Sequence, residues 1–184
     1  MIDRILRIVK LDFSVFKEIE ADPNATGQAV IIVVLASFLS AIGTWWRADT
    51  PGAFVTVFLS SFISGVVGWV VWAIVTHYMG KALYQSGGTL EGMLRVLGYA
   101  TAPRFLGIFE IIPCFGALAG LAGLILSLIA GIMAISEGLD VSTGQAIIVA
   151  VIGWIALFIV TAIIGLILGG AALITYGLCT AFTR

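Results

Sequence analysis

The stretch Arg95-Val-Leu-Gly-Tyr-Ala-Thr-Ala-Pro-Arg-Phe-Leu-Gly-Ile-Phe-Glu-Ile-Ile-Pro113 decides how the rest of the chain is interpreted. It is apolar enough to enter a bilayer, yet it contains Arg104 near its middle and Glu110 near its end. Pro103 and Pro113 interrupt it, because proline lacks a backbone donor and fits poorly inside a helix. We expect an irregular helical segment within a membrane, surrounded by more regular helices.

The composition predicts an all-α, polytopic membrane protein. Of 184 residues, 61% are hydrophobic and only 10% are charged, whereas soluble domains have about a quarter charged residues. A helix that crosses the ~30 Å hydrocarbon layer needs about 20 apolar residues. We therefore expect a single transmembrane domain over residues 22–184, with five transmembrane helices at about 28–46, 53–78, 93–113, 116–136 and 145–168 or longer.

The first residues have the periodicity of an amphipathic helix. Ile2, Ile5, Leu6, Val9, Phe13 and Phe16 fall on one face at helical spacing, and Asp3, Arg7, Lys10, Ser14 and Lys17 fall on the other. This pattern is typical of a helix that lies in the membrane interface. We predict such a helix over residues 1–21, with Arg7, Lys10 and Lys17 toward anionic headgroups; docking on a soluble partner is the alternative.

The distribution of basic residues predicts the orientation, because short cytoplasmic loops are enriched in Lys and Arg. With a cytoplasmic amino terminus, the outer side holds only Arg47 and Arg184. With five spans, the carboxyl terminus is then external. The basic residues on the predicted inner side are Arg4, Arg7, Lys10, Lys17, Lys81 and Arg95.

Four stretches together resemble the Yip domain family of membrane proteins, and its bacterial-type members most closely. They are Asp22-Pro-Asn-Ala-Thr26, Arg95-Val-Leu-Gly-Tyr-Ala-Thr-Ala-Pro103, Ile112-Pro-Cys-Phe-Gly116 and Ala134-Ile-Ser-Glu-Gly-Leu-Asp-Val-Ser-Thr-Gly-Gln-Ala146. The resemblance implies five spans, a cytoplasmic amino terminus and, for a bacterial-type member, the inner membrane. It also implies a non-enzymatic scaffold or adaptor linked to membrane organisation or trafficking.

Eukaryotic members of that family are linked to small Rab-type GTPases and vesicle traffic. They have a long cytoplasmic amino-terminal region and an Asp-Leu-Tyr-Gly-Pro motif before the first span. Here about 26 residues precede that span, and Asp22-Pro-Asn-Ala-Thr26 stands in the place of the motif.

Arg104 is the main candidate for a functional or structural polar site, together with Tyr99, Pro103 and Glu110. An Arg at the bilayer centre costs about 2.5–3.5 kcal/mol on insertion scales, so it faces the bundle interior or water. One hypothesis is that Arg104 braces the broken helix by binding a carbonyl freed by Pro103, near Tyr99. The other is that it contacts an anion or lines a path, as in a small channel or transporter. On an α-helix Glu110 would point elsewhere, about 240° away, and we expect it to reach interfacial water.

Small residues in the predicted fourth span favour close helix packing. Packing within the chain is one interpretation, and the seam of a homodimer is the other. The residues concerned are Gly116, Gly120, Gly123, Ser127 and Gly131, with Ala119 beside them.

The sequence shows no pattern of catalysis, metal binding or nucleic-acid binding. It has one histidine and two cysteines, without the spacing of metal ligands or of a nucleophile and its base. No basic patch exists beyond the first helix, which argues against a nucleic-acid partner. We expect no enzymatic activity and no cofactor.

Overall fold

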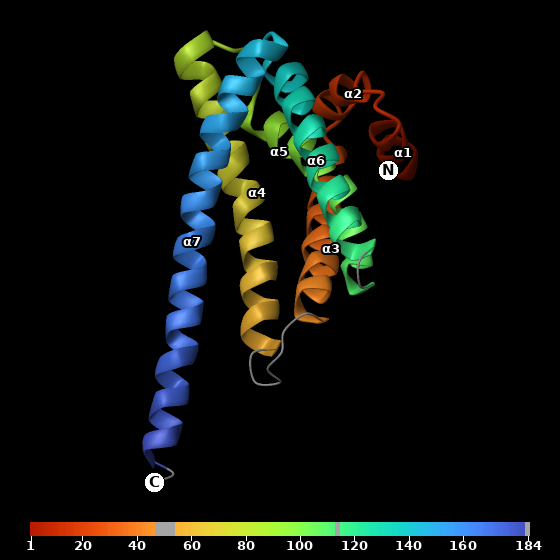
Figure 1. Ribbon diagram of the computed structural model, residues 1–184. Helices are drawn as coiled ribbons and strands as arrows, with labels where there is room; N and C mark the ends of the chain where they lie inside the picture. Colours follow the sequence, from red (N-terminus) through yellow and green to blue (C-terminus); the bar gives the residue numbers. More distant parts are fainter. Residues whose placement is uncertain (47–53, 113–114, 183–184) are drawn as a thin grey trace.

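The computed structural model describes residues 1–46, 54–112 and 115–182 (Figure 1). Within these ranges, side chains at 43–46, 54, 56–57, 107, 110–111, 115, 117 and 168–182 are not part of the description. Arg47, Pro113 and Arg184, which entered the sequence analysis, lie outside the described residues.

Within the described ranges the chain is helical and has no β-strand. Two short helices are followed by long helices that run up and down the bundle (Figure 1). The elements are α1 (Ile2–Val9), α2 (Val15–Ala21), α3 (Ala25–Trp46), α4 (Phe54–Tyr84), α5 (Leu90–Ala100), η2 (Ala102–Ile111), α6 (Phe115–Leu139) and α7 (Thr143–Phe182).

Four of the described helices are long and apolar enough to cross a membrane. Their apolar segments are Ala25–Ile42, Phe58–Tyr84, Leu118–Leu139 and Thr143–Ile167. Large side chains such as Phe158 remain exposed along α7, as expected where lipid is the surrounding solvent. The protein is therefore an integral, multi-pass membrane protein.

The segment expected as the third span, 93–113, is interrupted, as its prolines indicated, and it is not among the four described helices long and apolar enough to cross a membrane. α5 has 11 residues, and the chain continues as the ten-residue 3₁₀ helix η2, with proline in its first turn. Pro103 lacks the N–H that would continue the α-helix, and its ring clashes with the preceding turn. α5 and η2 connect the end of α4 to the start of α6 (Figure 1), and η2 packs against both α3 and α6.

The prediction of a single helix over residues 1–21 was wrong, because the chain turns between α1 and α2. Leu11 adopts a left-handed conformation with φ 64°, which ends an α-helix. The turn lets α2 bury Val15, Phe16 and Ile19. α2 packs on α5 and α6 instead of lying free on a surface.

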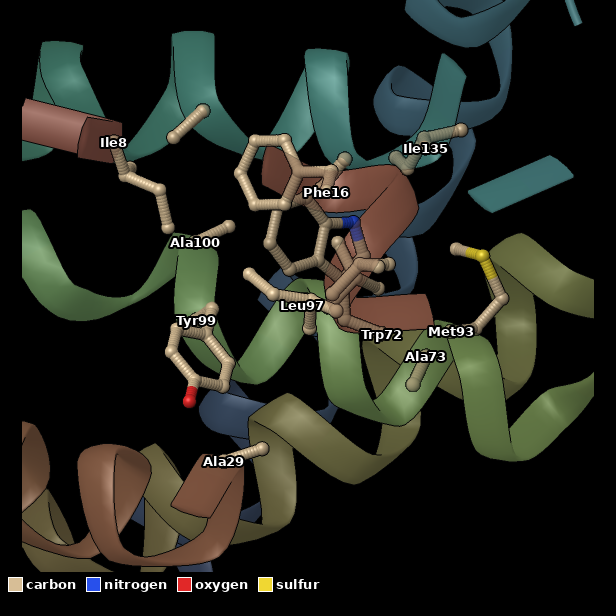
Figure 2. Close-up of a cluster of buried hydrophobic side chains, with 14 of the residues drawn as sticks. Ile8, Phe16, Ala29, Trp72, Ala73, Met93, Leu97, Tyr99, Ala100 and Ile135 are labelled. Carbon is tan, nitrogen blue, oxygen red and sulfur yellow. The ribbon is translucent and has the colours of Figure 1, made fainter. Parts of the chain in front are cut away.

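The buried core lies where α2, α4, α5 and α6 meet (Figure 2). Phe16 of α2 lies among Leu97 of α5, Ile135 of α6 and Trp72 of α4. The last helix, expected to reach residue 168 or beyond, is α7, which continues through residues 169–170 to Phe182. The core therefore fills one end of the bundle, and the long helices extend from it.

Candidate functional site

Arg104 lies beside a cavity of about 330 Å³ among the long helices. The cavity is bounded by the middle parts of α3, α4, α6 and α7, with Thr101 and Arg104 from the broken segment. Its other polar lining comes mainly from serine and threonine hydroxyls and three tryptophans. Because the lining residues lie mid-helix, the cavity is within the membrane-spanning part of the molecule.

The guanidinium of Arg104 has no bond to the carbonyls at the helix break. Thr101 already donates to the Gly98 carbonyl, with N–O 3.2 Å and Oγ1–O 2.7 Å, and its N–H also reaches the Tyr99 carbonyl. Ser127 donates to the carbonyl of Ala100 over 2.9 Å. The carbonyls that a bracing arginine would use are therefore occupied by hydroxyl and backbone donors.

Within the described part of the chain, Arg104 has no carboxylate partner either. Its side chain is exposed, and it is among the residues that line the cavity. An Arg in this position would cost about 2.5–3.5 kcal/mol if it faced hydrocarbon. A cavity that contains hydroxyl groups reduces that cost, since these hydroxyls or water there can solvate the charge.

The neighbours of Arg104 in the sequence are placed firmly. Tyr99 is fully buried, and its hydroxyl donates to the amide oxygen of Gln28 on α3. Pro103 lies against α6, where a Cβ at Gly123 would be 3.0 Å from the Pro103 carbonyl oxygen. These contacts hold the start of η2 against α3 and α6.

The 3₁₀ geometry changes the relation between Arg104 and Glu110. With 3.0 residues per turn, six residues make two full turns, about 12 Å along the axis. The two positions therefore share one face of η2, whereas an α-helix would have separated them by about 240°. The Glu110 side chain is outside the described part of the structure.

The small residues of α6 face neighbouring elements of the same chain. Gly123 approaches η2, Ser127 bonds to α5, and a Cβ at Gly131 would lie 2.4 Å from Cη2 of Trp72 on α4. Gly116 is buried and Gly120 is half-buried. At Gly123, Ser127 and Gly131, the row of small residues is therefore covered by other helices of the same chain.

The predicted membrane-surface cations differ in their surroundings. Arg7 donates to Asp12 over 2.8 Å and to Glu18 over 2.9 Å. Lys17 pairs with Asp140 in the α6–α7 loop, and Asp140 raises the pKa of Lys17. Lys10 is exposed. Two of the three predicted membrane-surface cations therefore form ion pairs with carboxylates of this protein.

The sequence analysis missed the role of Arg95, which is buried at the junction of several segments. Nε donates to the Thr26 hydroxyl over 2.7 Å, Nη1 to the Glu20 carbonyl over 2.9 Å, and Nη2 to the Glu91 carboxylate over 3.2 Å. Only the Glu91 contact, four residues away, could have been predicted from helical spacing.

The amino-terminal cap, defined here as α1, α2 and the side chains that bind them, has further ion pairs. Arg4 donates to Asp22 over 2.8 Å and lowers the pKa of that carboxyl. Burial raises the pKa of Glu20, where α2 approaches α5. The charged groups of the cap thus join chain segments to one another.

The described residues contain no group of His, Cys, Asp and Glu side chains able to hold a metal ion. Comparison with curated proteins and with solved structures gave no match. The model of the Yip1 domain family matches residues 12–179. That match covers most of the chain and agrees with its apolar helices, so the protein belongs to the Yip1 domain family of membrane proteins.

Proposed function

We propose that the protein is a non-enzymatic membrane scaffold or adaptor whose amino-terminal cap presents an assembled surface at one face of the membrane. The observation that supports this is the use of the charged side chains in the cap. Arg95 binds α2, the start of α3 and Glu91, and Lys17 binds the α6–α7 loop. Charges engaged in this way build a defined surface, and they are not arranged as a nucleophile and its base.

The orientation in this proposal has the cap on the cytoplasmic side of a bacterial inner membrane. The cap lies at the end of the bundle where α3 begins, and the carboxyl end of α7 extends the other way (Figure 1). Lys81 near the end of α4 and Arg95 on α5 belong to the same end as the cap. A basic cytoplasmic end agrees with the positive-inside rule. α5 and η2 complete a five-pass path with the carboxyl terminus outside.

The proposal also includes contact between α1 and the lipid surface. Ile2, Leu6 and Val9 share one face of α1 and are 69%, 52% and 47% exposed. Apolar side chains on such a face enter the headgroup boundary, with basic residues toward anionic lipids. Lys10 is the cation best placed to add to this attraction, because Arg7 and Lys17 already have carboxylate partners.

A flux assay combined with cross-linking tests the scaffold proposal. Liposomes containing the purified protein should conduct anions and protons no faster than protein-free liposomes. A benzoylphenylalanine at exposed position 3 in α1 should give discrete protein adducts in cells, whereas one at lipid-facing position 163 in α7 should label lipid. Protein-dependent flux, or lipid adducts alone from the cap, would contradict a scaffold.

A further inference from the structure

The cavity beside Arg104 has more hydrogen-bond donors than its described surroundings use. The hydroxyls of Ser37, Ser61 and Ser64 bond to no described residue. Arg104 adds five N–H donors and has no acceptor of its own. A membrane protein interior with so many unused donors is incomplete without acceptors.

The charge of the cavity points to the class of ligand. Among the described lining residues Arg104 is the only charged side chain. A cation would be repelled by the guanidinium, and a purely apolar molecule would leave the donors unsatisfied. An anion with several oxygen acceptors satisfies both the charge and the donors, and a guanidinium can bind two of its oxygens at once.

We propose that this cavity binds a singly charged oxyanion, with Arg104 as the ion-pairing residue and the serine hydroxyls as further donors. One cation in a low-dielectric site balances one negative charge, which fits a phosphate monoanion or the phosphodiester of a lipid headgroup. The volume of about 330 Å³ lies at the lower end of the range for small-ligand sites, about 300–1,000 Å³.

The site does not depend on the scaffold role. A scaffold could lack this ligand, and an anion could bind here whatever the cap contacts. The two ligand sources share their chemistry but differ in route, because a headgroup arrives with acyl chains and a free ion arrives from water. Each source needs its own arm of the experiment.

The test is the thermal stability of the full chain, stripped of lipid in an uncharged detergent. One arm titrates sodium phosphate against sodium chloride at equal ionic strength. The other adds short-chain phosphatidylglycerol against an uncharged short-chain diacylglycerol. We expect stabilisation in at least one arm. Arg104→Gln should raise the concentration for half-maximal stabilisation about thirtyfold or more, the loss expected when one partner of a buried charge pair is removed.

Three further variants keep the outcome decisive. Lys81→Gln removes an exposed cation outside the cavity and should respond like the parent. Ser61→Ala with Ser64→Ala keeps Arg104 and should weaken the response even if Arg104→Gln fails to fold. Glu110→Gln tests the acid on the same face of η2, and it should leave the response unchanged.

Stabilisation by phosphate identifies a free-anion site, and stabilisation by phosphatidylglycerol alone identifies a headgroup site. Either result supports the proposal if the Arg104 or serine variants weaken the response. No stabilisation in either arm would overturn it. A response that appears only in Glu110→Gln would also overturn it, since Glu110 would then be the native partner of Arg104.

Discussion

Arg95 donates from Nε to the hydroxyl of Thr26 over 2.7 Å, a contact that joins α5 to the first turn of α3 across 69 positions of the chain. The same guanidinium reaches the Glu20 carbonyl at the end of α2 and the Glu91 carboxylate. Arg95 is only 9% exposed. One planar side chain therefore positions three helices at the cap end of the bundle.

Replacing Arg95 by Lys should destabilise the protein by about 1–3 kcal/mol. The ammonium keeps the charge but lacks the planar fork that reaches three acceptors, and buried polar groups left without a partner carry a cost of this size. Thermal unfolding in detergent measures the loss. Arg4→Lys is the matched control, since Arg4 pairs with one carboxylate, Asp22, and interacts with the Tyr99 hydroxyl, and it should lose less. Equal losses would mean that Arg95 does not act as a junction.

Substituting alanine for Gly131 or Gly153 should destabilise the bundle by about 1–3 kcal/mol, the usual cost of overpacking. Trp72 of α4 lies against both glycines: a Cβ would be 2.4 Å from its Cη2 at Gly131 and 2.5 Å from its Cδ1 at Gly153.

Gly144→Ala is the control, because a Cβ there has no atom within 4 Å. It should gain up to about 1 kcal/mol from helix propensity. In thermal unfolding, Gly131→Ala and Gly153→Ala should lower the melting temperature, whereas Gly144→Ala should leave it unchanged or raise it. A stable Gly131→Ala protein would show that Trp72 can move without cost.

The contact between Lys17 and Asp140 should contribute about 0.5–1 kcal/mol, as expected for an exposed ion pair. A double-mutant cycle with Lys17→Gln and Asp140→Asn measures it. Asn is chosen because residue 140 is left-handed, with φ 53°, and Asn tolerates that conformation. Hydrogen exchange of α2 should rise in either single variant. Strictly additive effects would indicate that the contact contributes nothing to holding the cap.

Acidification should loosen the cap through Asp22. Its folded-state pKa is lowered by the Arg4 hydrogen bond, so its contribution to stability is present above the unfolded value of about 3.9. That contribution is lost as the pH falls through the folded-state pKa. Asp22→Asn should therefore lose less stability than the parent in this range.

Ser14 and Arg7 lower the pKa of Asp12 in the same way, so Asp12 adds to the acid sensitivity of the parent. The effect of Asp22 is therefore the difference in melting temperature between the parent and Asp22→Asn at each pH. Burial raises the pKa of Glu20, so its protonation as the pH falls favours the folded state. Glu20→Gln removes this effect and should therefore lose more stability than the parent on acidification. Melting temperatures of the parent and variants across pH test both signs. Parallel curves for the parent and Asp22→Asn would contradict the role of Asp22.

Topology reporters should place the α4–α5 loop and the carboxyl terminus on opposite sides of the membrane. Insertion at Gly87 suits this test, since it is exposed with open space around it, and it should report the cytoplasm. A fusion after Arg184 should report the outside. The same side for both would mean that α5 and η2 turn back without crossing.

Local composition was enough to predict the membrane class and the existence of most helices. Long apolar segments can satisfy their backbone groups in lipid only as helices, so α3, α4, α6 and α7 lie near the predicted spans. Pro103 also predicted an interruption, because it lacks a backbone donor whatever surrounds it. The sequence did not predict a 3₁₀ helix after the break, which depends on how η2 packs between α3 and α6.

The amino-terminal segment shows the limit of periodicity. Its alternation of apolar and charged residues predicted two faces of one helix, but periodicity could not reveal the turn at Leu11 or what each face contacts. Val15, Phe16 and Ile19 are buried by α5 and α6, more than 70 positions away. Lys17 likewise has its partner Asp140 in a distant loop.

The sequence by itself determined that Arg104 had to face something polar, because a charge in hydrocarbon is costly. What it faces was decided only by the tertiary structure. Five elements from across the chain meet around the cavity, and the carbonyls nearest the break are bound by Thr101 and Ser127. Local chemistry sets which groups need partners, whereas the packing of distant helices decides which partners lie within reach.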